Sequence, residues 1–313
     1  MKTPKWFMKK NLVAILLLPF AGVYYLSSRA VFKLRARNPL QSKRKIVCIG
    51  NILAGGVGKT PIVRQIAEFL DAPVVMRGYK QTQYTNGIGD EAIMLARGGL
   101  NVHTGDRKSN IILLNKQKSK NPIVMDDGFQ NPAIEKDISV IVIDENFGFG
   151  NGFLLPAGPK RETVAALNRA DAVIIMQNAR APKKYQSQKS ARDALKLPEK
   201  MPVFFAENTT ISPYAENEPL VAFAGIGYPK KFFDRLKNVV VKKSFPDHYQ
   251  YNDKDLKYLF DLANKNNARL ITTEKDWVRL PVDVRDEIKY AKLETKIESK
   301  FFDWLEGKLN GDF

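Results

Sequence analysis

The stretch that decides the fold is IVCIGNILAGGVGKTPIVRQIAEFL, residues 46–70. An apolar run predicts a strand, a glycine-rich segment follows, and apolar residues at helical spacing then predict a helix. Glycines let the backbone wrap closely around a polyphosphate, since the N–H groups and the positive end of the next helix then face the anion. The sequence therefore predicts a phosphate-binding loop, although Leu53 stands where the usual motif has its first glycine.

The loop also assigns individual roles. Lys59 is expected to reach the β- and γ-phosphates, and the Thr60 hydroxyl is expected to bind Mg²⁺. Arg161, in LLPAGPKRE at residues 154–162, is expected to contact phosphate from the start of a helix. The residues predicted to bind the nucleotide are therefore Gly55, Gly56, Val57, Gly58, Lys59, Thr60 and Arg161.

A second acidic motif, PIVMDDGFQN at residues 122–131, follows a predicted strand. Adjacent carboxylates repel one another unless a cation offsets their charge, so Asp126 and Asp127 are predicted to bind Mg²⁺ together with Thr60. An ordinary turn at a strand end is the plain alternative. Asp144, which ends another predicted strand, is a rival acidic group.

Candidates for proton transfer are few, because the chain has only two histidines. His248 stands beside Asp247 in SFPDHYQY, where it could accept a proton from a hydroxyl, although a surface histidine near a proline is mostly structural. Asp106 follows a predicted strand and could face a substrate hydroxyl, but a helix N-cap is at least as good an explanation. His103 lies within a predicted strand, and a structural role is favoured for it.

Short apolar runs alternate with helical stretches, which is typical of a mostly parallel α/β sheet. Predicted strands are 45–51, 73–77, 101–104, 122–126, 138–144, 172–176, 203–206, 220–224, 270–273 and 288–293. Predicted helices are 61–70, 90–97, 107–116, 161–168, 229–236, 253–265 and 299–309. A boundary in the polar stretch 207–218 predicts a nucleotide-binding domain at 45–212 and a smaller α/β domain at 213–313, after an N-terminal segment at 1–44.

The net charge of +17 is concentrated at the N-terminus. Residues 1–45 hold 11 of the basic side chains and no acidic one. These basic side chains lie on both sides of an uncharged run over residues 11–28. The run predicts a membrane-associated helix that meets an anionic lipid surface. A cleaved signal peptide, a buried helix and a single membrane span are the alternatives; nucleic acid is the least supported partner. The single cysteine excludes an intramolecular disulfide.

Together these motifs are similar to those of the tetraacyldisaccharide 4'-kinase family of lipid A biosynthesis. The segments that resemble it run in order from residue 50 to 280: GNILAGGVGKTP, MRGYK, GDEA, Asp106-Arg107, DDGFQN, LLPAGPKRE, FAGIGYPKKFF, FPDHYQY and TTEKDWVRL. The apolar N-terminal helix matches as well, so the resemblance covers nearly the whole chain.

The resemblance implies ATP- and Mg²⁺-dependent phosphorylation of the 4'-hydroxyl of a tetraacyldisaccharide 1-phosphate, which yields lipid IVA. It implies a P-loop NTPase-like domain, a smaller α/β domain with the cleft between them, and work at the cytoplasmic face of the inner membrane. It also implies that Asp106 and His248 act together as the base on the sugar hydroxyl. The catalytic residues predicted on this basis are Asp106, His248 and Lys59.

Five positions depart from the usual family motifs: Lys80, Ala92, Asn131, Lys160 and Tyr228. None of the five is among the residues predicted to act in catalysis or to bind the nucleotide or Mg²⁺.

A nucleotide-dependent switch of the partitioning or metallochaperone type is the competing class, because it also carries GGVGKT. Such proteins favour a lysine just before the glycines, where Ala54 stands, and GTPases among them carry an N-K-x-D motif that the sequence lacks. Both observations favour the kinase.

Overall fold

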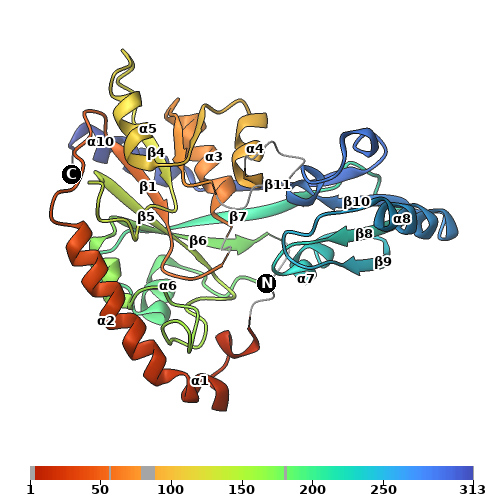
Figure 1. Ribbon diagram of the computed structural model, residues 1–313, viewed down its shortest axis with the longest axis horizontal. Coiled ribbons are helices and arrows are strands. Elements are labelled where there is room, and N and C mark those ends of the chain that lie inside the picture. The colour runs from red at the N-terminus through yellow and green to blue at the C-terminus, as the bar shows by residue number, and fades with distance from the viewer. Residues whose placement is uncertain (1–3, 56–57, 79–88, 180–181, 313) are drawn as a thin grey trace. The chain divides into compact units, whose positions relative to one another are not determined.

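A computed structural model describes residues 4–55, 58–78, 89–179 and 182–312 of the chain (Figure 1). The chain divides into two compact units, and neither is a continuous stretch of sequence. The larger unit comprises Pro4–Arg77, Gly99–Glu207 and Thr295–Phe313. The smaller unit is built mainly from Gly78–Gly98 and Asn208–Glu294.

The larger unit is built on a sheet with the strand order β3-β2-β4-β1-β5-β6-β7. Its paired strands from β3 to β6 run parallel. The strands are β1 (Ile46–Gly50), β2 (Val74–Met76), β3 (Val102–Thr104), β4 (Ile123–Asp126), β5 (Ile138–Asp144), β6 (Ala172–Asn178) and β7 (Val203–Ile211). Every residue of β1, β4 and β5 is buried, as expected of central strands covered on both faces.

The larger unit also contains helices on the sheet and at the chain ends. They are η1 (Lys5–Phe7), α1 (Leu12–Leu16), α2 (Leu18–Arg35), α3 (Lys59–Phe69), α5 (Arg107–Leu114), η3 (Val164–Arg169), α6 (Gln188–Leu195) and α10 (Ser299–Asn310). Helix α3 buries Ile62, Val63, Ile66 and Ala67 on one stripe, each large side chain worth about 1.5–3 kcal/mol of transfer free energy.

Helix α3 also contacts the C-terminal end of the chain. The Gln65 amide donates to the carbonyl of Thr295, and its oxygen accepts the backbone N–H of Ile297 at 3.2 Å. Both partners lie in β11 (Lys289–Ile297), just before α10. The helix that follows the phosphate loop is therefore supported by β11.

The smaller unit has a parallel sheet of its own order, β11-β10-β8-β9. Besides β11, its elements are α4 (Asp90–Arg97), β8 (Leu220–Ala224), α7 (Pro229–Phe233), β9 (Val239–Ser244), α8 (Asp253–Lys265), β10 (Arg269–Thr273), α9 (Glu274–Trp277) and η4 (Val282–Val284). Phe223, Tyr251 and Leu259 lie in one of its core clusters, and Phe232 and Ile271 lie in another.

The prediction of a mostly parallel α/β sheet is confirmed, and the division of the chain differs from the contiguous ranges 45–212 and 213–313. Helix α4 groups with the later segment that carries β8 to β10, whereas α10 groups with the larger unit. The chain passes between the units after Arg77 and after Gly98, and again within β7 and within β11, so the two later passages lie inside strands. A boundary predicted from composition cannot identify a strand, such as β7 or β11, whose residues belong to both units.

The N-terminal run 11–28 forms two helices, since α1 ends at Leu16 and α2 starts with Pro19 in its first turn. Among the residues described, no helix combines the length and the apolar character that a bilayer crossing needs. Ala21 of α2 is buried and Tyr24 is half-buried, whereas Phe20, Val23 and Leu26 are 62–69% exposed. One face of α2 therefore packs on the larger unit and another presents apolar side chains.

Several elements differ from expectation, and α9, η1 and η4 are short helices that were not predicted. Helix α6 forms inside the polar stretch 178–200, because Ser187 and Ser190 make a reciprocal capping box and Ala191 and Leu195 are buried. Strand β9 was not predicted; its exposure alternates along VVVKKS, as on the edge of a sheet. The helix expected at 161–168 is the 3₁₀ helix η3, which starts at Val164.

Candidate functional site

The phosphate loop lies where the sequence predicts it, between β1 and α3 of the larger unit. Gly55 and Gly58 have φ of 108° and 83°, conformations that residues with a Cβ rarely adopt. Helix α3 begins at Lys59, so its free N–H groups follow directly on the loop. The predicted contacts Gly56 and Val57 lie outside the described residues.

Asp127 is the counterion of the predicted nucleotide-binding cations. Its carboxylate lies 3.2 Å from Lys59 Nζ and accepts hydrogen bonds from Arg161 at 2.8 and 3.0 Å. Burial alone would raise the pKa of Asp127, but the hydrogen bonds of Arg161 and the charge of Lys59 outweigh it and hold that pKa far below its ordinary value. The carboxylate is therefore ionised and is held by two cations that triphosphate would also attract.

The backbone at Asp127 is itself unusual, with φ of 51°. Non-glycine residues in this left-handed region carry a strain of about 1–3 kcal/mol, which persists only where the surroundings enforce it. Here the Asp127 N–H donates to the carbonyl of Ile49 at 2.8 Å, and Arg107 donates to the carbonyls of Asp126 and Asp127 at 2.7 and 3.2 Å. The acidic motif is thus held against the end of β1.

Arg161 joins the phosphate loop to the loop that precedes η3. Its N–H donates to Ile52 O at 2.7 Å, and its guanidinium donates to the carbonyl of Asn51 at 3.1 Å and to the Asn51 side chain. Tyr24 of α2 donates its hydroxyl to the carbonyl of Arg161 at 3.2 Å. Arg161 therefore lies in the loop before η3 and not at a helix start, since η3 begins at Val164.

Asp126 ends β4, where it pairs with Ile49 of β1, at the edge of the sheet where α/β proteins bind ligands. No group of three or more acidic, histidine or cysteine side chains among the described residues could hold a metal by itself. Mg²⁺ commonly takes one or two protein oxygens and completes its shell with water and phosphate. The hard oxygen donors of Asp126 and Thr60 fit that role, whereas Asp127 already faces two cations.

Asp106 and the rival Asp144 both make local hydrogen bonds. Asp106 caps helix α5, because its carboxylate accepts the N–H and the hydroxyl of Ser109 at 2.8 and 2.7 Å. These bonds lower the pKa of Asp106. Asp144 accepts the N–H groups of Asn146 and Phe147 in the turn after β5. The resemblance predicts a part for Asp106 in the base, whereas its bonds to Ser109 account for its carboxylate as a helix cap.

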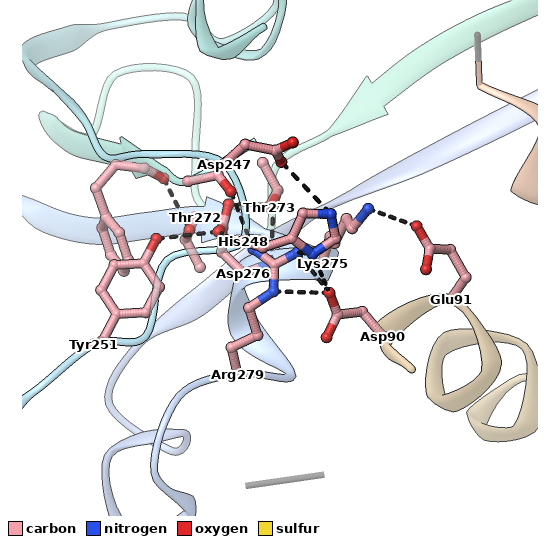
Figure 2. Close-up of polar contacts among 12 residues, drawn as sticks. Asp90, Glu91, Asp247, His248, Tyr251, Thr272, Thr273, Lys275, Asp276 and Arg279 are labelled. Carbon is pink, nitrogen blue, oxygen red and sulfur yellow. Dashed lines mark hydrogen bonds and ion pairs between the residues drawn. The ribbon is translucent and has the colours of Figure 1, made fainter. Parts of the chain in front are cut away.

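His248 has a different carboxylate as its neighbour. Its Nδ1 lies 3.1 Å from Asp90 Oδ2, the first residue of α4, within the smaller unit (Figure 2). Asp90 is fully buried, whereas the His248 side chain is 18% exposed. His248 has φ of 59°, a second strained residue in the candidate site, and its N–H donates to Gly225 O at 2.9 Å.

Further charged groups lie around this pair. The His248 Nε2 atom is 3.8 Å from Asp247, and Glu91 of α4 pairs with Lys275 of α9 at 2.5 Å. Arg279, which follows α9, donates to Asp90 from two nitrogens (Figure 2). Asp90 and Arg279 are functional candidates that sequence reasoning missed. The signals were present in GDEA and TTEKDWVRL, but one was interpreted as a helix start and the other was left without a role.

Most positions that depart from the family motifs lie away from these contacts. Tyr228 is 60% exposed before α7, Ala92 is buried in α4, and Asn131 accepts the N–H of Ala133. Lys160 pairs its backbone with Phe153 and Leu155 next to Arg161, and burial lowers its pKa. Lys80 lies outside the described residues. His103 lies in β3, and burial lowers its pKa too.

Comparison with known proteins adds independent findings. The family model described as tetraacyldisaccharide-1-P 4'-kinase matches residues 13–310. A protein named tetraacyldisaccharide 4'-kinase from Maricaulis maris is 38% identical over 277 residues, which cover 82% of this chain and 80% of that protein. One of the same name from Rickettsia bellii is 36% identical over 299 residues, with 88% and 89% covered.

The fold has a solved counterpart. The structure described as the "apo" form of LpxK from Aquifex aeolicus in complex with ATP aligns with a TM-score of 0.73 and 22% sequence identity. The alignment covers 96% of this chain and 99% of that one. At this identity the likeness establishes the shared fold.

Proposed function

The chain belongs to the tetraacyldisaccharide-1-P 4'-kinase family, and from that premise we propose that it transfers the γ-phosphoryl group of ATP to the 4'-hydroxyl of tetraacyldisaccharide 1-phosphate in lipid A biosynthesis. The observation that carries the proposal is the His248–Asp90 pair, which a kinase needs in order to accept the proton of an attacking sugar hydroxyl. Lys59 and Arg161 supply the cations for the triphosphate.

In the ligand-free chain, Lys59 and Arg161 share the carboxylate of Asp127. When ATP binds, its phosphate oxygens attract the same cations, and the free N–H groups at the start of α3 point at them. The two basic side chains then stabilise the negative charge on the transferring phosphoryl group. Positioning and electrostatic stabilisation of this kind account for most of the catalysis of phosphoryl transfer.

Asp126 and Thr60 would hold Mg²⁺ together with the nucleotide, as their oxygen donors fit this cation. Bound there, the ion would offset charge on the β- and γ-phosphates. Asp127 retains a different role in this proposal, as the anion that keeps Lys59 and Arg161 in place.

The proton of the sugar hydroxyl passes to the Asp90–His248 pair through His248, because that side chain is partly exposed whereas Asp90 is fully buried. With Asp90 on Nδ1, the imidazole presents Nε2 as the proton acceptor. The buried carboxylate then stabilises the imidazolium that forms, as in other histidine–carboxylate pairs.

The N-terminal helices support a place at a membrane. The apolar side chains of Phe20, Val23 and Leu26 are mostly exposed on α2, and basic residues follow toward its C-terminal end. Such a helix lies in the interface of an anionic bilayer, here the cytoplasmic face of the inner membrane. The substrate carries acyl chains, so we propose that α2 brings the enzyme to the surface that holds it.

A radiolabel assay tests the activity. The purified chain is incubated with γ-labelled ATP, Mg²⁺ and tetraacyldisaccharide 1-phosphate in detergent micelles, and lipid is separated from free phosphate. Label is expected in the lipid, and Lys59→Ala is expected to reduce the transfer at least about 100-fold. Lys45→Ala is the matched control, as the Lys45 side chain is exposed ahead of β1. Label only in free phosphate would overturn the proposal in favour of a nucleotide switch, and full activity of Lys59→Ala would overturn the role assigned to Lys59.

A further inference from the structure

Arg279 is a fully buried cation that no step of the phosphoryl transfer has used. The side chains of Arg279 and Asp90 are both 0% exposed. Removing a guanidinium from water is costly unless charged and polar partners surround it, so a buried arginine has a defined set of contacts. Arg279 donates to Asp90 Oδ2 from Nε at 2.9 Å and from Nη2 at 2.6 Å.

The remaining donors of Arg279 reach two other segments. Its Nη1 donates to Gly225 O at 3.0 Å and to Asp276 Oδ1 at 3.1 Å. Gly225 O also accepts the backbone N–H of His248, so one carbonyl connects the arginine to the histidine loop. A Cβ on Gly225 would lie 3.0 Å from Asp276 Oδ1, which leaves little room for a side chain there. The planar fork of arginine reaches these acceptors at once, and lysine cannot.

Asp276 is itself anchored from both sides. Its carboxylate accepts the hydroxyl of Tyr251 at 3.1 Å and the hydroxyl of Thr273 at 2.6 Å (Figure 2). Tyr251 is 1% exposed and packs against Phe223 in the core of the smaller unit. The orientation of Arg279 is therefore set by the core and not by solvent-exposed side chains.

The contacts on Asp90 are asymmetric. Oδ2 faces the two Arg279 nitrogens and His248 Nδ1, whereas Oδ1 is buried without a hydrogen-bond partner among the described residues. The Nη2 atom of Arg279 is also 3.2 Å from His248 Nδ1. One guanidinium thus fixes both the rotation of the carboxylate and the place of the imidazole that faces it.

We propose that Arg279, anchored by Asp276, is a positioning residue that holds the Asp90 carboxylate ionised and oriented against His248 Nδ1 for phosphoryl transfer. The inference rests on the proposed function, because it assumes that the Asp90–His248 pair accepts the proton. It gives the conspicuous motif TTEKDWVRL a role: Thr273 and Asp276 position Arg279, and Arg279 positions the base.

The charge balance around Asp90 supports this role. Burial would raise the pKa of Asp90, but the hydrogen bonds from His248 and Arg279 outweigh it and lower that pKa. Loss of Arg279 should therefore raise the pKa of Asp90 and move the acid limb of the pH–rate profile to higher pH. Two side chains are hydrogen-bonded to Asp90, those of His248 and Arg279. The other charged or titratable groups around these three residues are Lys275, Glu91, Asp276, Asp247 and Tyr251.

The test compares Arg279→Lys with Arg285→Lys as the matched control. Arg285 lies in the same unit and donates to the carbonyls of Leu280 and Val278; within the part of the chain that the structure describes, it makes no hydrogen bond to Asp90 or His248. For Arg279→Lys we expect kcat to fall about 10–100-fold near neutral pH, the acid limb to rise in pH, and part of the activity to return in alkali. The KM for ATP should change less than about twofold, whereas Arg285→Lys should keep the wild-type profile.

Histidine NMR gives a readout that does not depend on turnover. With only two histidines, a ¹⁵N-histidine-labelled chain shows His248 and, as an internal reference, His103. Tyr251→Phe removes one anchor of Asp276 and keeps the packed ring, so it covers the case in which Arg279→Lys does not fold. Either variant should shift the His248 Nδ1 resonance and leave that of His103 in place.

A wild-type kcat and pH profile in a folded Arg279→Lys, or unchanged His248 resonances in both variants, would overturn the inference. A loss of rate that is equal at every pH would also overturn it, since a structural role alone produces that pattern. Asp90→Asn separates this inference from the proposed function. If Asp90→Asn keeps full activity, the assignment of the base fails; if it is inactive while Arg279→Lys resembles wild type, only the role of Arg279 fails.

Discussion

Asp127→Asn distinguishes two roles for the second carboxylate of the acidic motif: a Mg²⁺ ligand, or the counterion of Lys59 and Arg161. The structure shows three contacts from these cations, at 2.8, 3.0 and 3.2 Å. Hydrogen bonds to charged groups contribute about 1.5–3 kcal/mol each, against about 1 kcal/mol for neutral ones. Asparagine keeps one acceptor oxygen and loses the charge, so we expect the ligand-free variant to be destabilised by about 2–3 kcal/mol. At about 2–4 °C per kcal/mol, its Tm should fall by about 4–12 °C.

ATP should reverse much of this loss. Triphosphate supplies the anion that the variant lacks, and removal of a like charge near the phosphates should strengthen binding. A ligand at 100 times its Kd stabilises the folded protein by about 2.7 kcal/mol, so the gain is within range of a thermal shift measurement. The Tm difference between wild type and variant should shrink by at least half at saturating ATP, with and without Mg²⁺.

Asp171→Asn is the matched control, because Asp171 accepts one backbone N–H, that of Ser139 at 2.8 Å, in the same unit. Any Tm deficit of this control should be the same with and without ATP. If Mg²⁺-ATP stabilises Asp127→Asn less than it stabilises wild type, the counterion argument is refuted, and Asp127 is then a ligand of the metal or the nucleotide.

Four further outcomes are expected. Asp106→Asn should keep its transfer rate within about threefold, since asparagine caps helices equally well, whereas Asp90→Asn should lose about 100-fold or more in the same lipid kinase assay. Gly50→Ala should lower the free energy of unfolding by about 1–3 kcal/mol in urea, because the added Cβ would lie 2.6 Å from the Cβ of Phe129 in the acidic motif. Burial raises the pKa of the Cys48 thiol from 9.0 to about 11, so this thiol should resist alkylation at pH 8 until the chain unfolds. Because the folded chain holds this proton more tightly than the unfolded chain, the contribution of Cys48 to the free energy of unfolding should be lost as the pH rises from 9 toward 11. Leu26→Asp should weaken co-sedimentation with anionic vesicles and leave Tm unchanged, as Leu26 is 69% exposed; equal binding would contradict a role for α2 at the membrane.

The nucleotide half of the site could be predicted from sequence because its chemistry is local. A strand, a glycine loop and a helix are contiguous in residues 46–70, and Asp126 ends a strand that pairs directly with β1. Each element also buries its apolar residues in the pattern that its sequence shows. What composition could not show was that Asp127 faces Lys59 and Arg161 together.

The partner of His248 could not be predicted in the same way. Asp90 and Asp106 each follow a glycine and stand at the start of a helix, so their local sequences are nearly equivalent. Only the grouping of α4 with the later segment, more than 100 residues away in sequence, brings Asp90 to His248. Sequence alone cannot tell whether Asp90 or Asp106 is the partner of His248, because a helix cap and a catalytic base both require a carboxylate at this kind of position. The choice depends on tertiary structure.

The contact between Gln65 and β11 has a consequence for how the protein is made. Translation delivers the phosphate loop well before the strand that supports its helix and before the buried Phe301 and Leu305 of α10. The smaller unit is complete once Glu294 has been synthesised, while the larger unit still lacks its C-terminal segment. The portion of the chain that begins first is therefore finished last, and a chain released before α10 should have a poorly supported nucleotide site. A functional ATP site is in this sense a sign that synthesis has proceeded through α10.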